Sequence, residues 1–191
     1  MIRALIFDCF GVIYSEAKSS LTELCPPDKR LELMDLYAQS DHGFISGEEF
    51  SRAVAELIGM PPAELESIIS AQYVRNDQLL DFVRAQKATF KTALLSNVGD
   101  DLIGKLFTAD EQREFFDTIV LSSSVGFTKP SPEIYEIAAS RLGVLPEECI
   151  FTDDIPANID GANIVGMHGV LFTSNQQVKD DILAIAEREN A

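Results

Sequence analysis

Several short apolar runs in this sequence are followed by polar residues that can bind a cation or an anionic group. Together these residues supply two or three carboxylates, a hydroxyl and a lysine. Mg²⁺ prefers a few carboxylate oxygens together with water and phosphate oxygens, and a lysine neutralises the charge of a transferring phosphoryl group. The set therefore indicates metal-assisted chemistry on a phosphoryl group. The residues concerned are Asp8, Ser96, Asn97, Lys129, Asp153 and Asp154.

The apolar runs before these residues are predicted to be buried strands of a parallel sheet. They are continuous rather than alternating in hydrophobicity, as a sheet covered on both faces requires. Ligands of an open α/β sheet bind at the carboxyl ends of its strands, so the polar residues are expected to converge there. The expected strands are 4–7, 92–95, 118–121, 149–152 and 169–172.

The segments between the last four runs are long enough for crossover helices. We expect helices over 101–116, over 131–142 with Pro132 in its first turn, and over 157–165. Strands and helices then alternate along the chain. This succession predicts a doubly wound α/β fold, in which a parallel Rossmann-like sheet lies between two helical layers.

The interval between the first two strands is too long for one crossover and contains no strand-like run. Ser46 to Glu49 has the form of a capping box, which is a signature of a helix start. We therefore predict a helical subdomain over 15–86, inserted into an α/β core formed by 1–14 and 87–191. Within the insertion, apolar spacings of three and four and a returning segment predict helices over 21–24, 29–39, 46–57, 62–73 and 77–86.

The polar residues and their neighbours resemble, in order, the four motifs of the haloacid dehalogenase-like superfamily. The segments are FDCFGVI at 7–13, LSN at 95–97, KPSPEIY at 129–135 and FTDDIPAN at 151–158. The resemblance covers nearly the whole chain, and the helical insertion looks like the small cap of this superfamily. It implies a Mg²⁺-dependent hydrolase whose cap closes over the site and selects the leaving group.

The resemblance implies a covalent mechanism at a metal site. Asp8 is expected to attack phosphorus and form an aspartyl-phosphate, which divides hydrolysis into two displacements. The other oxygen of Asp8, the backbone carbonyl of Phe10 and the carboxylate of Asp154 are expected to bind Mg²⁺.

The resemblance also implies roles for the remaining motif residues. Ser96 and the amide of Asn97 are expected to hold the phosphoryl oxygens, and Lys129 to neutralise their charge. Asp153 and Asn158 are expected to orient the ligands of the metal and the lysine.

Phe10 departs from the pattern of the phosphatases in this superfamily. These enzymes normally carry a second aspartate two residues after the nucleophile, where it protonates the leaving group and then activates water. A phenyl ring does neither, and loss of a general acid or base typically lowers a rate by ~10²–10⁴-fold. Phe10 either packs beneath the cap or also shapes a substrate pocket, and the sequence does not decide between these interpretations.

Two alternatives to phosphate hydrolysis remain open. Haloacid dehalogenases proper also carry an aromatic residue at this position, because a halide leaves without a proton; metal-free hydrolysis of a 2-haloacid is the first alternative. Against it, Asp153 and Asp154 would repel Asp8 unless a cation joined them. The second alternative is a binding or regulatory module that keeps the Mg²⁺ and phosphate pocket without turnover.

Three further residues have suitable side chains, but no spacing assigns them a role. His168 precedes the last expected strand and is predicted to be structural, and His42 lies in the insertion. Arg75, near the end of the insertion, either contacts an anionic substrate or forms an ordinary ion pair.

The charge and cysteine content limit the partners and the location of the protein. With 31 acidic and 15 basic residues, the net charge of −16 opposes binding to nucleic acids and anionic membranes. We expect a small phosphorylated or halogenated substrate. Three unpatterned cysteines fit a reducing compartment, and the apolar run at 2–7 is too short for a signal peptide, so a cytoplasmic location is expected. The sequence names neither the substrate nor the oligomeric state.

Overall fold

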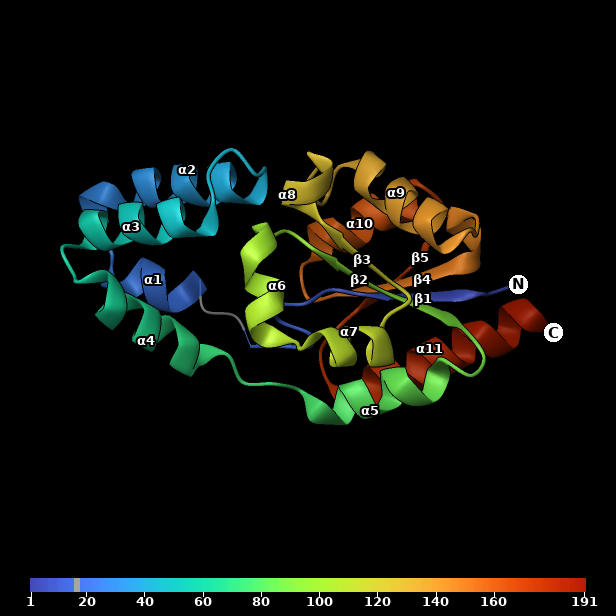
Figure 1. Ribbon diagram of the computed structural model, residues 1–191. Helices are drawn as coiled ribbons and strands as arrows, with labels where there is room; N and C mark the ends of the chain where they lie inside the picture. Colours follow the sequence, from blue (N-terminus) through green and yellow to red (C-terminus); the bar gives the residue numbers. More distant parts are fainter. Residues whose placement is uncertain (16–17) are drawn as a thin grey trace.

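A five-stranded parallel sheet forms the centre of the molecule in the computed structural model, which describes residues 1–15 and 18–191 (Figure 1). The strand order is β3-β2-β1-β4-β5, and every neighbouring pair is parallel. The predicted doubly wound fold is confirmed, and no strand end differs from its expected position by more than one residue. The strands are β1 (Ala4–Phe7), β2 (Lys91–Ser96), β3 (Thr118–Leu121), β4 (Cys149–Asp153) and β5 (His168–Leu171).

The central strand β1 shows why the sheet is covered on both faces. Its four residues are fully buried. Leu5 and Phe7 belong to one apolar cluster, which also holds side chains of α5 (Asp77–Gln86), α7 (Ala109–Phe115) and α11 (Asn175–Asn190). Ala4 and Ile6 belong to a second cluster with side chains of α9 (Pro132–Leu142) and α10 (Pro156–Ile164). Figure 1 shows these helices as layers on opposite faces of the sheet. Continuous apolar strands are stable in this arrangement because neither face meets water.

The helices of the core follow the predicted pattern with one correction. The single helix expected over 101–116 is wrong, because the chain is extended at Phe107 and a new helix starts after Thr108. Thr108 and Glu111 form a reciprocal capping box at that start. The C-terminal helix α11 was not predicted. The core helices are α5 (Asp77–Gln86), α6 (Asp100–Leu106), α7 (Ala109–Phe115), α8 (Ser122–Val125), α9 (Pro132–Leu142), η2 (Pro146–Glu148), α10 (Pro156–Ile164) and α11 (Asn175–Asn190).

The segment between β1 and α5 forms a separate group of helices, called the helical insertion below. It has a small apolar core of its own, to which Leu33, Val54 and Leu65 contribute. The capping box predicted at Ser46 is present, with reciprocal bonds to Glu49. In Figure 1 the insertion lies beyond the carboxyl ends of the strands. Its helices are α1 (Lys18–Leu24), η1 (Pro27–Lys29), α2 (Arg30–Asp41), α3 (Gly47–Ile58) and α4 (Pro62–Gln72).

Helix α5 packs with the α/β core rather than with the helical insertion. Its buried side chains Leu79, Leu80 and Val83 belong to the cluster beneath β1. The cap subdomain expected over 15–86 therefore includes a helix that packs elsewhere, and we propose that the insertion ends near Arg75. Among the described residues, no helix combines the length and apolar character of a membrane span.

Candidate active site

A buried lysine lies between two carboxylates at the carboxyl ends of β1 and β4. The ammonium nitrogen Nζ of Lys129 is 2.7 Å from Oδ1 of Asp8 and 2.6 Å from Oδ2 of Asp153. The side chains of these three residues are 2%, 7% and 0% exposed, respectively. The structure thus brings together residues that are far apart in the sequence, in a place where water does not screen their charges.

Backbone and side-chain hydrogen bonds hold the two carboxylates in place. Asp8 continues the ladder between β1 and β4, since its N–H donates to the carbonyl of Thr152 at 2.9 Å. Asp153 accepts from the N–H of Ile155 at 2.8 Å and from Nδ2 of Asn158 at 3.0 Å. Asn158 therefore contacts Asp153 directly and the lysine only through it. The hydroxyl of Tyr135 in turn donates to the carbonyl of Asn158 at 2.7 Å.

The two polar residues at the end of β2 differ in their contacts. The side chain of Asn97 bonds to the backbone of Lys129 at both ends, accepting from its N–H at 2.8 Å and donating to its carbonyl at 2.9 Å. The hydroxyl of Ser96 is buried and has no hydrogen-bond partner among the described residues. A buried hydroxyl without a partner is unfavourable in the free protein, so Ser96 is available to a ligand.

Asp154 completes a group of three carboxylates. Asp8, Asp153 and Asp154 each offer an oxygen within 4.8 Å of the others. Gly11 permits this approach: its φ is +86°, and a Cβ there would lie 2.2 Å from Oδ2 of Asp154. Three carboxylates facing one lysine leave an excess of negative charge, and their oxygens are the ligands that a divalent cation such as Mg²⁺ prefers.

Burial shifts the acid–base behaviour of this cluster. It raises the pKa of Asp8 to about 7, and Asp153 adds to this effect against the opposing charge of Lys129. Burial alone would lower the pKa of Lys129, but Asp8 and Asp153 outweigh it and raise that pKa. The lysine therefore stays charged. Cys9 points into the core, and burial raises the pKa of its thiol well above the usual value, so it is a poor nucleophile.

Phe10 lies outside the charge cluster and lines a cavity of about 880 Å³ between the helical insertion and the core. Its ring packs against Tyr73, with the ring centroids 5.5 Å apart. Asn97 lines the same cavity on the core side, and Tyr37 and Phe50 line it on the side of the insertion. Of the two interpretations of Phe10 from sequence, this position favours a residue that shapes a pocket.

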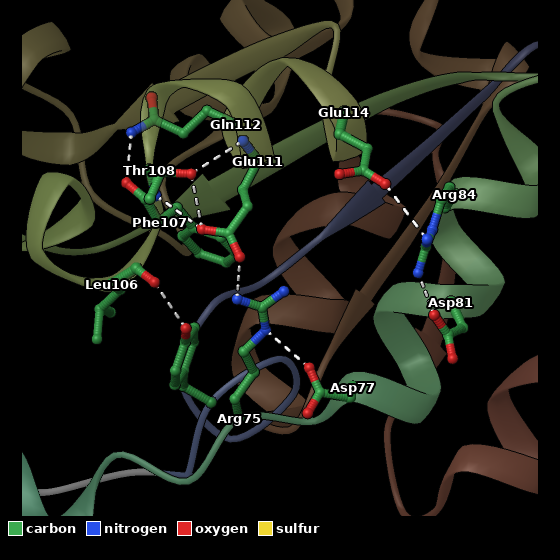
Figure 2. A network of polar contacts seen from close by, with 11 residues as sticks. Arg75, Asp77, Asp81, Arg84, Leu106, Phe107, Thr108, Glu111, Gln112 and Glu114 are labelled. Atoms are coloured by element: carbon green, nitrogen blue, oxygen red, sulfur yellow. Dashed lines mark hydrogen bonds and ion pairs between the residues drawn. The ribbon is translucent and has the colours of Figure 1, made fainter.

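Arg75 lies where the chain returns from the helical insertion to the core, and it is fully engaged there. Its guanidinium forms ion pairs with Glu111 of α7 at 2.5 Å and with Asp77 at 2.9 Å (Figure 2). It also lies over the rings of Phe107 and Phe115, at 5.7 and 5.5 Å from their centroids. The expectation of an ordinary ion pair therefore describes Arg75 better than contact with a substrate.

Sequence reasoning missed Ser122, which joins the loop after β2 to the helical insertion. Its hydroxyl accepts from the N–H of Val98 at 3.0 Å and donates to the carbonyl of Asp41. Ser122 directly follows β3, so the rule that polar residues at strand ends form the site would have identified it. The residue predicted for that strand, Lys129, lies seven residues later in the sequence.

Comparison with known proteins identifies the family. Residues 2–166 match the model of the haloacid dehalogenase-like hydrolases. The chain belongs to this family. It is therefore a hydrolase by family, and the order of the four sequence motifs is explained by common descent.

The chain is similar in sequence to three further proteins. D-ribitol-5-phosphate phosphatase of Bacteroides thetaiotaomicron is 25% identical over 177 residues, which are 83% of this chain and 86% of the relative. (S)-2-haloacid dehalogenase of Xanthobacter autotrophicus is 27% identical over 87% of this chain and 73% of its own length. Acyl-CoA dehydrogenase family member 10 of Mus musculus is 29% identical over 64% of this chain, and the match spans only 12% of that much longer protein.

A solved structure shares the fold of this haloacid dehalogenase-like chain. It is a HAD family enzyme from Bacteroides thetaiotaomicron, in complex with magnesium and inorganic phosphate. The two chains are 20% identical, with a TM-score of 0.75 over 91% of this chain and 95% of the other. At this level of identity the likeness supports the fold alone.

Proposed function

We propose that this chain is a Mg²⁺-dependent phosphatase that acts on a small phosphorylated metabolite through an aspartyl-phosphate at Asp8. The observation that carries the proposal is the buried cluster in which Asp8 contacts Lys129 beside Asp153 and Asp154. The excess of negative charge in this cluster suits a divalent cation and an incoming phosphoryl group. The phosphatase relative supports the same assignment.

We assign each residue of the cluster a part in this reaction. One oxygen of Asp8 forms the bond to phosphorus, and Lys129 holds Asp8 in place and neutralises the transferring group. The hydroxyl of Ser96 donates to a phosphoryl oxygen. Asp8, Asp154 and the carbonyl of Phe10 would hold Mg²⁺, which when bound would neutralise phosphate charge. The insertion would act as a cap that excludes water from the site.

A 2-haloacid dehalogenase is the second candidate, and two observations favour it. Phe10 offers an aromatic ring instead of an acid, and the dehalogenase of Xanthobacter autotrophicus matches 87% of this chain. The three clustered carboxylates argue against it, because a metal-free reaction leaves their repulsion uncompensated.

Paired assays distinguish the candidates. Hydrolysis of p-nitrophenyl phosphate is measured with Mg²⁺ and with EDTA, and chloride release from 2-chloropropionate is measured under the same two conditions. We expect phosphate release that requires Mg²⁺ and is lost in Asp8→Asn. Chloride release without Mg²⁺ and without phosphatase activity would identify the dehalogenase. If neither reaction occurs while Mg²⁺ and beryllium fluoride raise the melting temperature, the chain is a binding module.

A further inference from the structure

The cavity between the helical insertion and the core has mainly aromatic and aliphatic walls. Phe10 and Tyr73 form one ring pair in it, and Tyr37 and Phe50 form a second, with centroids 5.2 Å apart. Leu102 of α6 adds an aliphatic side chain. Such walls favour a ligand with a planar apolar ring, because burial removes its surface from water and the wall rings offer edges and faces for contact.

Most of the charged side chains in the cavity wall are already paired with each other. Glu48 contacts Arg52 at 2.7 Å, and Glu66 of α4 contacts Lys105 of α6 at 3.1 Å. These four charged groups lie in exposed pairs with each other, and the uncharged polar side chains of the wall are hydroxyls and one amide, such as Ser51, Ser70 and Asn97. Asp41 is the fifth charged residue of the wall.

Phe10 places a second, independent demand on the substrate. When the P–O bond to the leaving group breaks, its electron pair stays on the leaving oxygen. An alkoxide, whose conjugate alcohol has a pKa near that of water at ~15.7, requires a proton at that moment, whereas a phenol-type hydroxyl with a pKa of about 10 or below leaves as its anion. A site with a ring at position 10 instead of an acid therefore suits a leaving group of the second kind.

We infer that the substrates of this proposed phosphatase are aryl phosphates, whose aromatic ring occupies the cavity between the insertion and the core. The inference rests on the proposed function and adds the class of its substrate. The apolar walls favour an apolar ring, and the missing acid favours a leaving group of low pKa. An aryl phosphate meets both requirements.

The reaction balances without a general acid. An oxygen of Asp8 bonds to phosphorus while the P–O(aryl) bond breaks, and the aryloxide leaves with the electron pair and takes its proton from solvent. Water then bonds to phosphorus, the P–O bond to Asp8 breaks, and the proton of that water passes to solvent. No side chain at position 10 activates the water, so the second displacement is the slower one and a burst of phenol precedes steady turnover.

A comparison of phenyl phosphate with cyclohexyl phosphate tests the leaving-group argument in the wild-type protein. Both rings are apolar and similar in size, but only phenol leaves readily as an anion. We expect kcat/KM for phenyl phosphate to exceed that for cyclohexyl phosphate and ribitol 5-phosphate by ~10²-fold or more. Similar values for all three would overturn the inference and leave the phosphatase assignment intact. No turnover of any phosphate ester, including p-nitrophenyl phosphate, would instead refute the proposed function.

Two variants test whether an acid is missing or supplied by the insertion. Phe10→Asp should raise turnover of cyclohexyl phosphate by at least 10-fold and change that of phenyl phosphate less. Asp41→Asn should leave the ratio of the two substrates unchanged. If Asp41→Asn selectively removes cyclohexyl turnover, Asp41 supplies the acid and the inference is wrong.

The position of the ring is tested by binding. Phenylphosphonate, which is not hydrolysed, should bind the wild-type protein in Mg²⁺ at least 10-fold more tightly than methylphosphonate, because one ring buries apolar surface in the cavity. Phe50→Leu should reduce that preference several-fold. The matched control is Phe44→Leu, since Phe44 lies on the same insertion but is 76% exposed and outside the cavity lining. Equal affinity for the two phosphonates would contradict the inference.

Discussion

The two main charge clusters of this protein are built in opposite ways. At the strand ends, Lys129 is buried between Asp8 and Asp153, with Asp154 nearby, so three carboxylates face one cation. Between the insertion and α7, the side chain of Arg75 is 27% exposed and pairs with two carboxylates (Figure 2). It also lies over two aromatic rings.

The pKa of one carboxylate in each cluster is shifted, and the two shifts have opposite directions. Burial raises the pKa of Asp8 to about 7, so its charged form is disfavoured in the folded protein. Hydrogen bonding to Arg75 lowers the pKa of Glu111 to about 2, so its charged form is favoured. The charge of Asp8 thus lowers the free energy of unfolding, and the strand-end cluster is arranged for a ligand. The charges around Arg75 are paired with one another, and they connect the insertion to the core.

The largest expected effect comes from Asp8→Asn, which should separate activity from stability. Loss of the nucleophile should reduce hydrolysis by ~10⁵–10⁶-fold. At pH 8 without metal, the same change should raise the melting temperature by about 2–6 °C, because a disfavoured buried charge is removed and Lys129 keeps Asp153. Rates and thermal melts in EDTA measure both effects. Asp77→Asn is the control, and a lower melting temperature for Asp8→Asn would break the comparison.

Lys129→Met should be the most destabilising change at the strand ends. It leaves Asp8 and Asp153 buried without a counter-charge, and breaking a buried pair in this way costs about 3–5 kcal/mol. Lys105→Met, which removes an exposed partner of Glu66, should change the unfolding free energy by only about 0–1 kcal/mol. Urea unfolding at pH 8 in EDTA compares the two variants, and equal losses would show that burial does not control the effect.

Much of the fold could be predicted from the sequence, because continuous apolar runs and helix-start signals are local. The convergence of Asp8, Lys129 and Asp153 followed from the rule that parallel strands end at one edge. The apolar pattern predicts one helix because it continues through Phe107, where the helix in fact ends. Thr108 and Glu111 have the types and spacing of a capping box, which marks the start of the next helix. The capping box at Ser46 predicts a helix start correctly, and the one at Thr108 is the same kind of local signal.

The partners of Arg75 and Asn97 were beyond the reach of sequence patterns. Glu111 lies 36 residues after Arg75, and Asn97 bonds to the backbone of Lys129, 32 residues away. Such contacts depend on how helices pack against the sheet, and no spacing rule describes them. The cavity around Phe10 is likewise formed by residues that are distant in the sequence. Only their positions in the fold show that the ring of Phe10 lines a pocket.

The two clusters should also respond to pH in opposite windows. The pKa of Asp8 is raised when the protein folds, so its contribution to stability is present below about pH 4 and is lost as the pH rises to about 7. The pKa of Glu111 is lowered, so its contribution is present above about pH 4.5 and is lost as the pH falls toward 2. In EDTA, Asp8→Asn should therefore remove the fall in unfolding free energy that Asp8 causes between pH 4 and 7, and Glu111→Gln should remove the fall that Glu111 causes below pH 4.5. Unchanged slopes in both variants would remove the basis of the comparison.

The smallest expected effect distinguishes the two roles of Glu111. Besides pairing with Arg75, Glu111 accepts from the N–H of Thr108 at 2.9 Å in the capping box of α7. Glutamine also serves in a capping box, so Glu111→Gln should remove only the charge pair, at about 0.5–1 kcal/mol because the pair is partly exposed. Glu111→Ala removes the cap as well and should cost about 1 kcal/mol more.

In a double-mutant cycle, Arg75→Met should show coupling to Glu111→Gln and none to Glu114→Gln, since Glu114 contacts Arg84 instead. Coupling of zero to Glu111 would mean that Arg75 is held by the rings of Phe107 and Phe115 rather than by charge.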